Sequence, residues 1–208
     1  NNGKIFFYTI IYLFYYEVCL AQVRVGDWNS LTSCLQIRDI ELIENTLFAA
    51  TEGGVLTVVE QENNIITNIN GLNGVDILSI EKDMHDNLWI GGNSPGFIQR
   101  FSPLQKTVVS EFPYNFSEIS HIISADSFAY AVFRDNQDWG IAEYRFIDGS
   151  FKHHDLYPVW IVAENGINDI IFDDTKVFVA TQSGIYSGVS GTNPNSWTPL
   201  SSEIVNNV

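Results

Sequence analysis

The chain is short of positive charge. Its 208 residues include 10 lysines and arginines against 25 aspartates and glutamates, which gives a formal net charge of −15. A surface of that sign repels phosphate backbones and anionic lipid headgroups, so nucleic acid is not an expected partner. Because acidity also keeps exported domains soluble, we interpret the charge as a solubility feature rather than as an acidic functional surface.

Cysteine is scarce as well, since Cys19 and Cys34 are the only two. We expect Cys19 to leave with an N-terminal leader, so that Cys34 has no partner in the mature chain. No internal disulfide can then form, and packing must supply the stability. The expected role of Cys34 is that of a small buried apolar residue.

The first 21 residues differ from the rest. Lys4 precedes an apolar run over 5–16, and small residues, Cys19 and Ala21, stand three and one before an expected cut after Ala21. This arrangement is typical of a secretory signal peptide, and the run is shorter than the roughly 20 residues that cross a bilayer. We therefore expect a signal peptide over 1–21 and an exported partial β-propeller over 22–208, in the periplasm, at the outer-membrane surface or outside the cell.

Helix-period segments of ten or more residues are absent from the mature chain, which instead contains a repeat. IRDIELIENTLFAATEGGVL from Ile37 and INDIIFDDTKVFVATQSGIY from Ile167 align without a gap. Looser copies begin at Ile77 and Ile119, so the four anchor isoleucines are 40, 42 and 48 residues apart. Ile204 is expected to open a fifth copy.

An aromatic residue and a glycine also recur in this frame. An aromatic stands seven residues before the third, fourth and fifth anchors, and Trp28 precedes Ile37 by nine. We expect these aromatics to pack between sheets. The glycine is expected where a Cβ would obstruct the backbone, or in an ordinary turn. The positions given a structural role are Trp28, Gly54, Trp89, Gly96, Gly140, Trp160, Gly184 and Trp197.

Each copy is predicted to contain four short strands. In the first copy these are Ile37–Ile43, Leu47–Thr51, Val55–Val59 and Ile65–Ile69, separated by polar and glycine-containing turns. Four strands per roughly 40 to 45 residues is the size of a propeller blade. The predicted fold is an all-β propeller with four four-stranded antiparallel blades and the start of a fifth, stacked face to face.

Histidine clusters do not predict a metal site. His153-His154-Asp155 is the most metal-like group, but adjacent strand residues point to opposite faces and would not chelate one ion together. His85 and His121 are isolated, and we interpret both as structural histidines. We expect neither a metal nor a cofactor.

The acidic pairs fall where each copy has a hairpin. Asp173-Asp174 occupies the slot of Glu44-Asn45 and of Asp83–Asn87, where turn chemistry accounts for carboxylates. Asp135–Gly140 lacks the residues that define an Asp-box turn of sialidase-like propellers. Phosphate loops and the GxSxG, HExxH and CxxC motifs are absent from the sequence. We therefore predict that the chain is not an enzyme.

Two families share motifs with this sequence. Asp86–Gly91, DNLWIG, resembles the repeat of two-component-regulator propellers. VGDWNSLTS, LFAATEGGVLTV and INGLNGVDILSI resemble the N-terminal propeller of PorZ-like proteins of the type IX secretion machinery. The shared features are Gly26–Trp28, Ala49–Gly54 and Asn70–Leu72.

The PorZ-like resemblance covers the mature chain and implies a non-catalytic accessory that helps attach exported cargo at the bacterial surface. The leading hypothesis is therefore an exported binding module for a protein or a cell-surface glycan, with no binding residue assigned. A periplasmic sensor propeller of a two-component signalling protein is the alternative. A carbohydrate-active enzyme is the third hypothesis.

Overall fold

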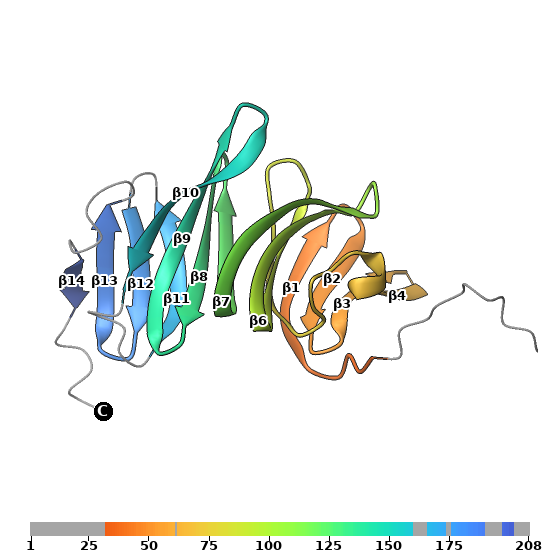
Figure 1. Cartoon of the computed structure of the whole chain (residues 1–208), viewed down its shortest axis with the longest axis horizontal. Helices are drawn as coiled ribbons and strands as arrows, with labels where there is room; N and C mark the ends of the chain where they lie inside the picture. The colour runs from red at the N-terminus through yellow and green to blue at the C-terminus, as the bar shows by residue number, and fades with distance from the viewer. Residues whose placement is uncertain (1–31, 61, 160–165, 174–175, 190–196, 202–208) are drawn as a thin grey trace, which may run out of the picture. The chain divides into compact units, whose positions relative to one another are not determined.

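The computed structural model describes residues 32–60, 62–159, 166–173, 176–189 and 197–201. Within these residues the chain forms fourteen β-strands and one 3-10 turn, arranged in three antiparallel sheets (Figure 1). The all-β class predicted from the sequence is therefore confirmed. The predictions for the 1–21 leader, Trp28, Trp160 and the fifth copy at Ile204 lie outside the described residues.

The first sheet matches the first copy. Its strands follow in chain order, and Glu44, with a φ of 53°, opens the tight turn between the first two. The β-branched and aromatic residues of these segments suit a pleated, half-buried surface. The strands are β1 (Ile37–Ile43), β2 (Thr46–Thr51), β3 (Gly54–Val59) and β4 (Glu62–Ile66).

The fourth strand of the first copy differs from its prediction. The expected strand Ile65–Ile69 ends at Ile66, and Asn68–Asn70 forms the 3-10 turn η1. The Thr67 hydroxyl accepts a hydrogen bond from the backbone N–H of Ile69, and the Asn70 side chain accepts one from that of Thr67. This capping box satisfies the backbone locally, so the chain leaves the sheet early.

The second and third copies share one six-stranded sheet, so the prediction of a separate four-stranded blade for each is wrong. Its order is β10-β9-β8-β7-β6-β5. The cause is that β7 serves both copies, since Glu118 pairs with Asn93 of β6 on one edge and with Arg134 of β8 on the other. The strands are β5 (Ile77–Lys82), β6 (Leu88–Ser102), β7 (Thr107–Ala125), β8 (Phe128–Asp135), β9 (Asp138–Ile147) and β10 (Ser150–Pro158).

The third sheet matches the fourth copy and repeats the first sheet. Both open with a strand that pairs with the next in the same register, and each third strand begins at a glycine, Gly54 or Gly184. The strands are β11 (Ile167–Asp173), β12 (Lys176–Thr181), β13 (Gly184–Val189) and β14 (Thr198–Ser201).

A β-bulge marks the start of every copy. The pairing register shifts directly after each of the four anchor isoleucines, between the anchor and the residue two positions later. A bulge adds one unpaired residue and turns the following side chains. The anchors, Ile37, Ile77, Ile119 and Ile167, therefore occupy the same structural position in all four copies.

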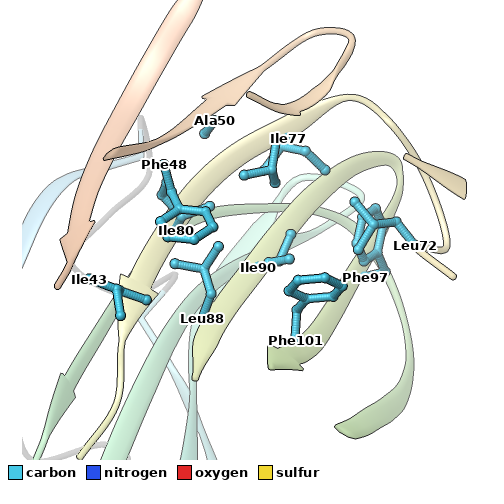
Figure 2. Packing of buried hydrophobic residues seen from close by; sticks show 11 residues of the cluster. Ile43, Phe48, Ala50, Leu72, Ile77, Ile80, Leu88, Ile90, Phe97 and Phe101 are labelled. Atoms are coloured by element: carbon cyan, nitrogen blue, oxygen red, sulfur yellow. The ribbon is translucent and has the colours of Figure 1, made fainter. Parts of the chain in front are cut away.

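Apolar side chains pack between neighbouring sheets. Figure 2 shows Phe48 and Ala50 of the first sheet together with Ile77 and Ile80 of β5, above Leu88, Ile90 and Phe101 of β6. A second cluster surrounds Trp89, and a third joins β8 and β9 to β11 and β12. Stacked sheets with apolar interfaces are the packing expected of a propeller, although the described residues show no closed ring.

Candidate functional site

The first strands of the four copies lie next to one another: β1 contacts β5, β5 contacts β7, and β7 contacts β11. We call these strands, with the Glu118–Ala125 half of β7, the inner strands. The residue two positions after each anchor follows the bulge on each of them. These residues, which we call the inner polar row, are Asp39, Ser79, His121 and Asp169.

The inner polar row links the first copy to the second, and the second to the third, through a side chain and a backbone amide. Asp39 Oδ2 accepts hydrogen bonds from the backbone N–H of Ile80, at 3.0 Å, and from Ser79 Oγ, at 3.0 Å. Ser79 Oγ in turn accepts one from the backbone N–H of Ile122, at 3.0 Å. The same step therefore joins the first copy to the second and the second to the third.

A second tier repeats this step two residues further along the inner strands. Glu41 Oε2 accepts a hydrogen bond from the backbone N–H of Lys82, at 3.4 Å. Glu81 accepts one from the backbone N–H of Ser124. Sequence reasoning missed these contacts, although acids recur two and four positions after the anchors in part of the copies.

The second tier brings carboxylates together. Burial and the nearby Glu41 carboxylate raise the pKa of Glu81 from 4.5 to about 7, and Asp39 adds to this shift. The Ser124 N–H and the Lys82 ammonium act in the opposite direction. Because the ionised form is disfavoured in the fold, Glu81 lowers the stability of the protein once it is charged.

We expect Glu81→Gln to stabilise the protein at pH 8 and to leave its stability unchanged below pH 4.5. Between pH 4.5 and 7 the folded state holds more protons than the unfolded state, so wild-type stability falls as the pH rises through this window. Since Glu81 is only half-buried, solvent reduces the gain to about 1–2 kcal/mol. Urea unfolding at pH 4.5 and pH 8 measures it.

Glu62→Gln is the matched control for that experiment, because Glu62 is exposed and the change removes the same charge. A higher free energy of unfolding at pH 8 in both variants would show a general effect of removing one negative charge. If Glu81→Gln raised the free energy of unfolding equally at both pH values, the ionisation of Glu81 would not be the cause of the increase.

The junction between the third and fourth copies is aromatic rather than polar. The backbone N–H of Ile170 donates to its own neighbour, Asp169 Oδ1, at 2.8 Å. The Phe172 ring lies 5.6 Å from that of Phe128 and 5.0 Å from that of Tyr130. His121 Nδ1 lies 3.1 Å from Oγ of the adjacent Ser120.

A groove of about 370 Å³ lies beside the first sheet and the end of β6. Phe48 and Phe101 belong to its lining but are only 3% and 2% exposed, so neither ring offers a face for stacking. Hydroxyl and amide groups of the lining and the Lys106 ammonium can hydrogen-bond a peptide or the edge of a sugar. The lining is Thr46, Phe48, Thr57, Val59, Asn64, Ile65, Ile66, Asn70, Phe101, Pro103 and Lys106.

Two of the recurrent glycines lie in a left-handed conformation at the same hairpin. Gly54 has a φ of 128° and Gly184 a φ of 137°. The hydroxyls of Thr51 and Thr181 donate to the carbonyls of these glycines, at 2.7 and 3.0 Å. A Cβ on Gly54 would lie 2.4 Å from the carbonyl oxygen of Ile66.

At the other two glycines, the lack of a side chain lets a neighbouring group pack closely against the backbone. A Cβ on Gly96 would lie 2.7 Å from the backbone nitrogen of Glu118, and one on Gly140 would lie 2.3 Å from the Phe133 ring. Neither glycine has a positive φ among the described residues. One sequence position therefore serves two structural needs.

The two described tryptophans of the repeat frame pack against apolar clusters. Trp89 is fully buried, and its ring stacks on Phe112 at 5.1 Å. Phe112 is the aromatic seven residues before the third anchor. Trp197 is half-buried and packs against the cluster that joins the second and third sheets.

The side chains of His153 and His154, for which no shared metal ion is predicted, lie in different surroundings. His153 packs its ring against Tyr114, at 4.8 Å, and burial lowers its pKa. The neighbouring His154 is exposed at a bulge of β10. Within the described ranges, no group of three His, Cys, Asp or Glu side chains could hold a metal ion. His85, in a turn, places its ring 4.6 Å from that of Phe146.

The hairpin acid Asp83 supports its turn and also forms a buried ion pair, whereas the turn at Asp174 lies outside the described residues. Asp83 Oδ1 accepts hydrogen bonds from the backbone N–H groups of His85, at 2.8 Å, and Asn87, at 3.1 Å. Asp83 Oδ2 pairs with the guanidinium of Arg100, with Nε at 2.9 Å. That guanidinium also lies over the rings of Trp89 and Phe151. Sequence reasoning found the turn but not its partner.

A buried glutamine holds the Asn-Gly-Leu link between the first and second copies. Gln99, which is fully buried, accepts a hydrogen bond from the backbone N–H of Asn73, at 2.8 Å. Its amide donates to the carbonyl of Gly71, at 3.2 Å. The link is therefore fixed to β6, next to the groove.

Comparison with known proteins identifies the fold. No family model and no curated protein matches the chain. Among solved structures, the WD40 β-propeller domain of Doa1 matches with a TM-score of 0.54 and 15% identity, over 79% of this chain and 56% of that one. The chain has a β-propeller-like fold.

Two further matches are an extracellular domain and a bacterial surface component. The extracellular domain of the hybrid two component system BT4673 from B. thetaiotaomicron has a TM-score of 0.59 and 17% identity, over 75% of this chain and 22% of that one. PorZ, a surface component of the type-IX secretion system of Porphyromonas gingivalis, has a TM-score of 0.55 and 15% identity, over 76% and 25%. The chain thus spans about a quarter of either protein.

Membrane crossing by a helix has no support in the described residues, because none of their helices is long and apolar enough to span a bilayer.

Proposed function

We propose that this chain is a non-catalytic, exported binding module in which the four copies act as blades of a propeller. The observation that carries the proposal is that the buried and half-buried polar side chains bind backbone groups of the fold itself. Asp39, Glu41, Ser79 and Asp83 bind backbone groups of the fold, while the groove beside the first sheet is left for a ligand. Such an arrangement suits recognition by a rigid scaffold.

The likeness to PorZ and the sequence motifs support a role at the bacterial surface. PorZ is a surface component of the type-IX secretion system, and this chain has a similar fold. By this proposal, the module binds an exported protein or a cell-surface glycan through hydroxyl, amide and ammonium groups of the groove. It needs neither a metal nor a cofactor.

The groove is tested by Lys106→Glu combined with Asn64→Ala, since neither side chain belongs to the core. We expect the purified full chain to bind an outer-membrane extract or purified surface polysaccharide from a Bacteroidetes-type bacterium, and the double variant to bind at least tenfold more weakly. Lys152→Glu combined with Asn115→Ala, two exposed residues outside the groove lining, is the control. Equal binding by both double variants would contradict the assignment.

A sensor domain is the second candidate, supported by the likeness to the extracellular domain of BT4673. In a cell that carries the gene, the two functions give different results on deletion. Loss of the secretion accessory would release exported cargo from the cell surface. Loss of a sensor would leave the cargo attached and abolish an inducible transcriptional response.

A further inference from the structure

The outermost strand of the first sheet, β4, has an open edge, because no strand among the described residues pairs with it on the side away from β3. Val59 pairs with Glu62, so the β3–β4 hairpin has a two-residue loop. The closing pair of such a hairpin is hydrogen-bonded, and hydrogen-bonded and open pairs then alternate along the ladder. Asn63 and Ile65 therefore direct their backbone N–H and C=O groups away from β3, at the spacing of an extended strand.

The outer edges of the other copies are protected in a way that β4 is not. Prolines, lysines and bulges on an edge strand all hinder the addition of a further strand. β10 has a bulge and contains Lys152 and Pro158, and β14 contains Pro199. The part of β7 that pairs with β6 contains Pro113. The sequence of β4, ENNII, has neither proline nor lysine, and this strand pairs with β3 without a register shift.

The groove beside the first sheet runs along this open strand. Its lining includes Asn64, Ile65 and Ile66, which are consecutive in β4. Successive strand residues point to opposite faces of a sheet, so a groove that touches all three reaches the strand backbone as well as its side chains. The groove and the open edge therefore belong to one surface.

The side chains of this surface favour a partner with acidic and apolar residues. The described lining of the groove has no aspartate or glutamate, although the chain has 25 of them. Lys106 is the cation of the lining, and no carboxylate of the described residues pairs with it, whereas five other described cations form such pairs. Val59, also in the lining, is 41% exposed and gains from an apolar cover.

A sugar ring fits this surface less well than an extended peptide. The aromatic rings of the lining, Phe48 and Phe101, are buried, so they cannot stack on a sugar. A sugar also lacks the regular row of N–H and C=O groups that would match the backbone of Asn63 and Ile65. An extended peptide has that row.

We propose that this surface binds an extended segment of a partner protein, which adds a strand to the outer edge of β4 and directs an acidic side chain to Lys106. Main-chain hydrogen bonds to Asn63 and Ile65 hold the segment, while its alternate side chains enter the groove and give specificity. This inference rests on the proposed binding function and narrows the ligand of the groove to a peptide.

The probe is a set of linear twelve-residue peptides, selected from a phage-displayed random library on the purified full chain and then synthesised. We expect Asn63→Pro to weaken their binding at least tenfold, because proline removes an N–H from the open edge. Asn63→Ala is the matched control, since it keeps that N–H and should leave the binding unchanged. Both variants should keep the melting temperature, because Asn63 is exposed and its N–H does not bond β3.

N-methylation of the peptide backbone, one residue at a time, tests the added strand without changing the protein. We expect the loss of binding to alternate along the peptide, because only every second N–H of an added strand faces β4. Losses without this alternation would overturn the inference. Binding that Asn63→Pro leaves unchanged, or a selection that yields no binding peptide, would overturn it as well.

The inference and the proposed function can fail separately. If no peptide binds but surface polysaccharide does, and that binding depends on Lys106 and Asn64 yet not on the N–H of Asn63, the groove keeps its function and the peptide inference is wrong. If neither peptides, polysaccharide nor membrane extract bind, both are wrong. A dimer of the full chain that Asn63→Pro dissociates would show that a second copy occupies the edge, which would also overturn the inference.

Discussion

Asp83→Ala is expected to lower the free energy of unfolding by about 3–5 kcal/mol, because it leaves the buried guanidinium of Arg100 without its counter-charge. The side chains of Asp83 and Arg100 are 0% and 8% exposed, so water cannot replace the lost carboxylate. The substitution also removes the acceptor for the N–H groups of His85 and Asn87. Urea unfolding monitored by tryptophan fluorescence measures the loss.

A double-mutant cycle separates the ion pair from the turn. Asp83→Ala combined with Arg100→Met removes both charges, and we expect it to be more stable than Asp83→Ala alone, because no charge stays buried. Lys152→Ala, which breaks an exposed pair with Asp148, should cost less than about 0.5 kcal/mol. If Asp83→Ala cost no more than Lys152→Ala, the buried pair would not contribute to stability.

Trp89→Ala is expected to cost about 3–5 kcal/mol, since it empties the centre of the aromatic cluster in the second sheet. The Trp89 ring is fully buried between Phe112, Tyr144 and Phe151, with ring centroids 5.1 to 5.2 Å apart. It also lies under the Arg100 guanidinium, at 5.5 Å. A domain whose total stability is about 5–15 kcal/mol would therefore be partly unfolded at room temperature or on mild heating.

Trp89→Phe is the conservative variant for comparison with Trp89→Ala, and Leu104→Ala is the surface control. Phenylalanine keeps most of the aromatic contact, and we expect it to cost about half as much as alanine. Leu104 is 92% exposed, so its replacement should cost less than about 0.5 kcal/mol. Calorimetric melting temperatures that fall from the wild type to Trp89→Phe and again to Trp89→Ala would agree with this packing. Equal melting temperatures for Trp89→Ala and Leu104→Ala would contradict it.

The repeat was visible in the sequence because its signals are local. The anchor isoleucine, the hairpin turn and the small residues after it recur within about 20 residues, and backbone sterics fix what each of them does. The bulge after Ile37 and after Ile167 has the same register in both copies. Propensity and turn chemistry were enough to place these strands.

The sequence does not predict the fused sheet in the middle of the chain, because the length of a strand depends on the strands that pair with it. The alternation of exposed and half-buried residues continues through β7 past Pro113, so nothing local separates the end of one copy from the start of the next. Pairing with β6 and then β8 keeps the strand continuous. This fusion of two copies could not be deduced from turn residues alone.

The candidate site was the least predictable part. The groove depends on how the turn after β6 lies beside β3 and β4, which no local motif encodes. The bond between Asp83 and Arg100 spans 17 residues and depends on the register of β5 against β6. The contacts of the inner polar row could have been suspected from the recurrent acids, but the acceptor of each amide is set by sheet stacking.

Amide hydrogen exchange of Ile80 and Ile122, followed by NMR, tests the central claim that the same contact joins the first copy to the second and the second copy to the third. We predict that both amides are protected in the wild type. Asp39→Ala should then speed exchange at Ile80 but not at Ile122, and Ser79→Ala should speed it at Ile122, because these side chains are the respective acceptors. Fast exchange of both amides in the wild type, or protection unchanged in both variants, would contradict the account.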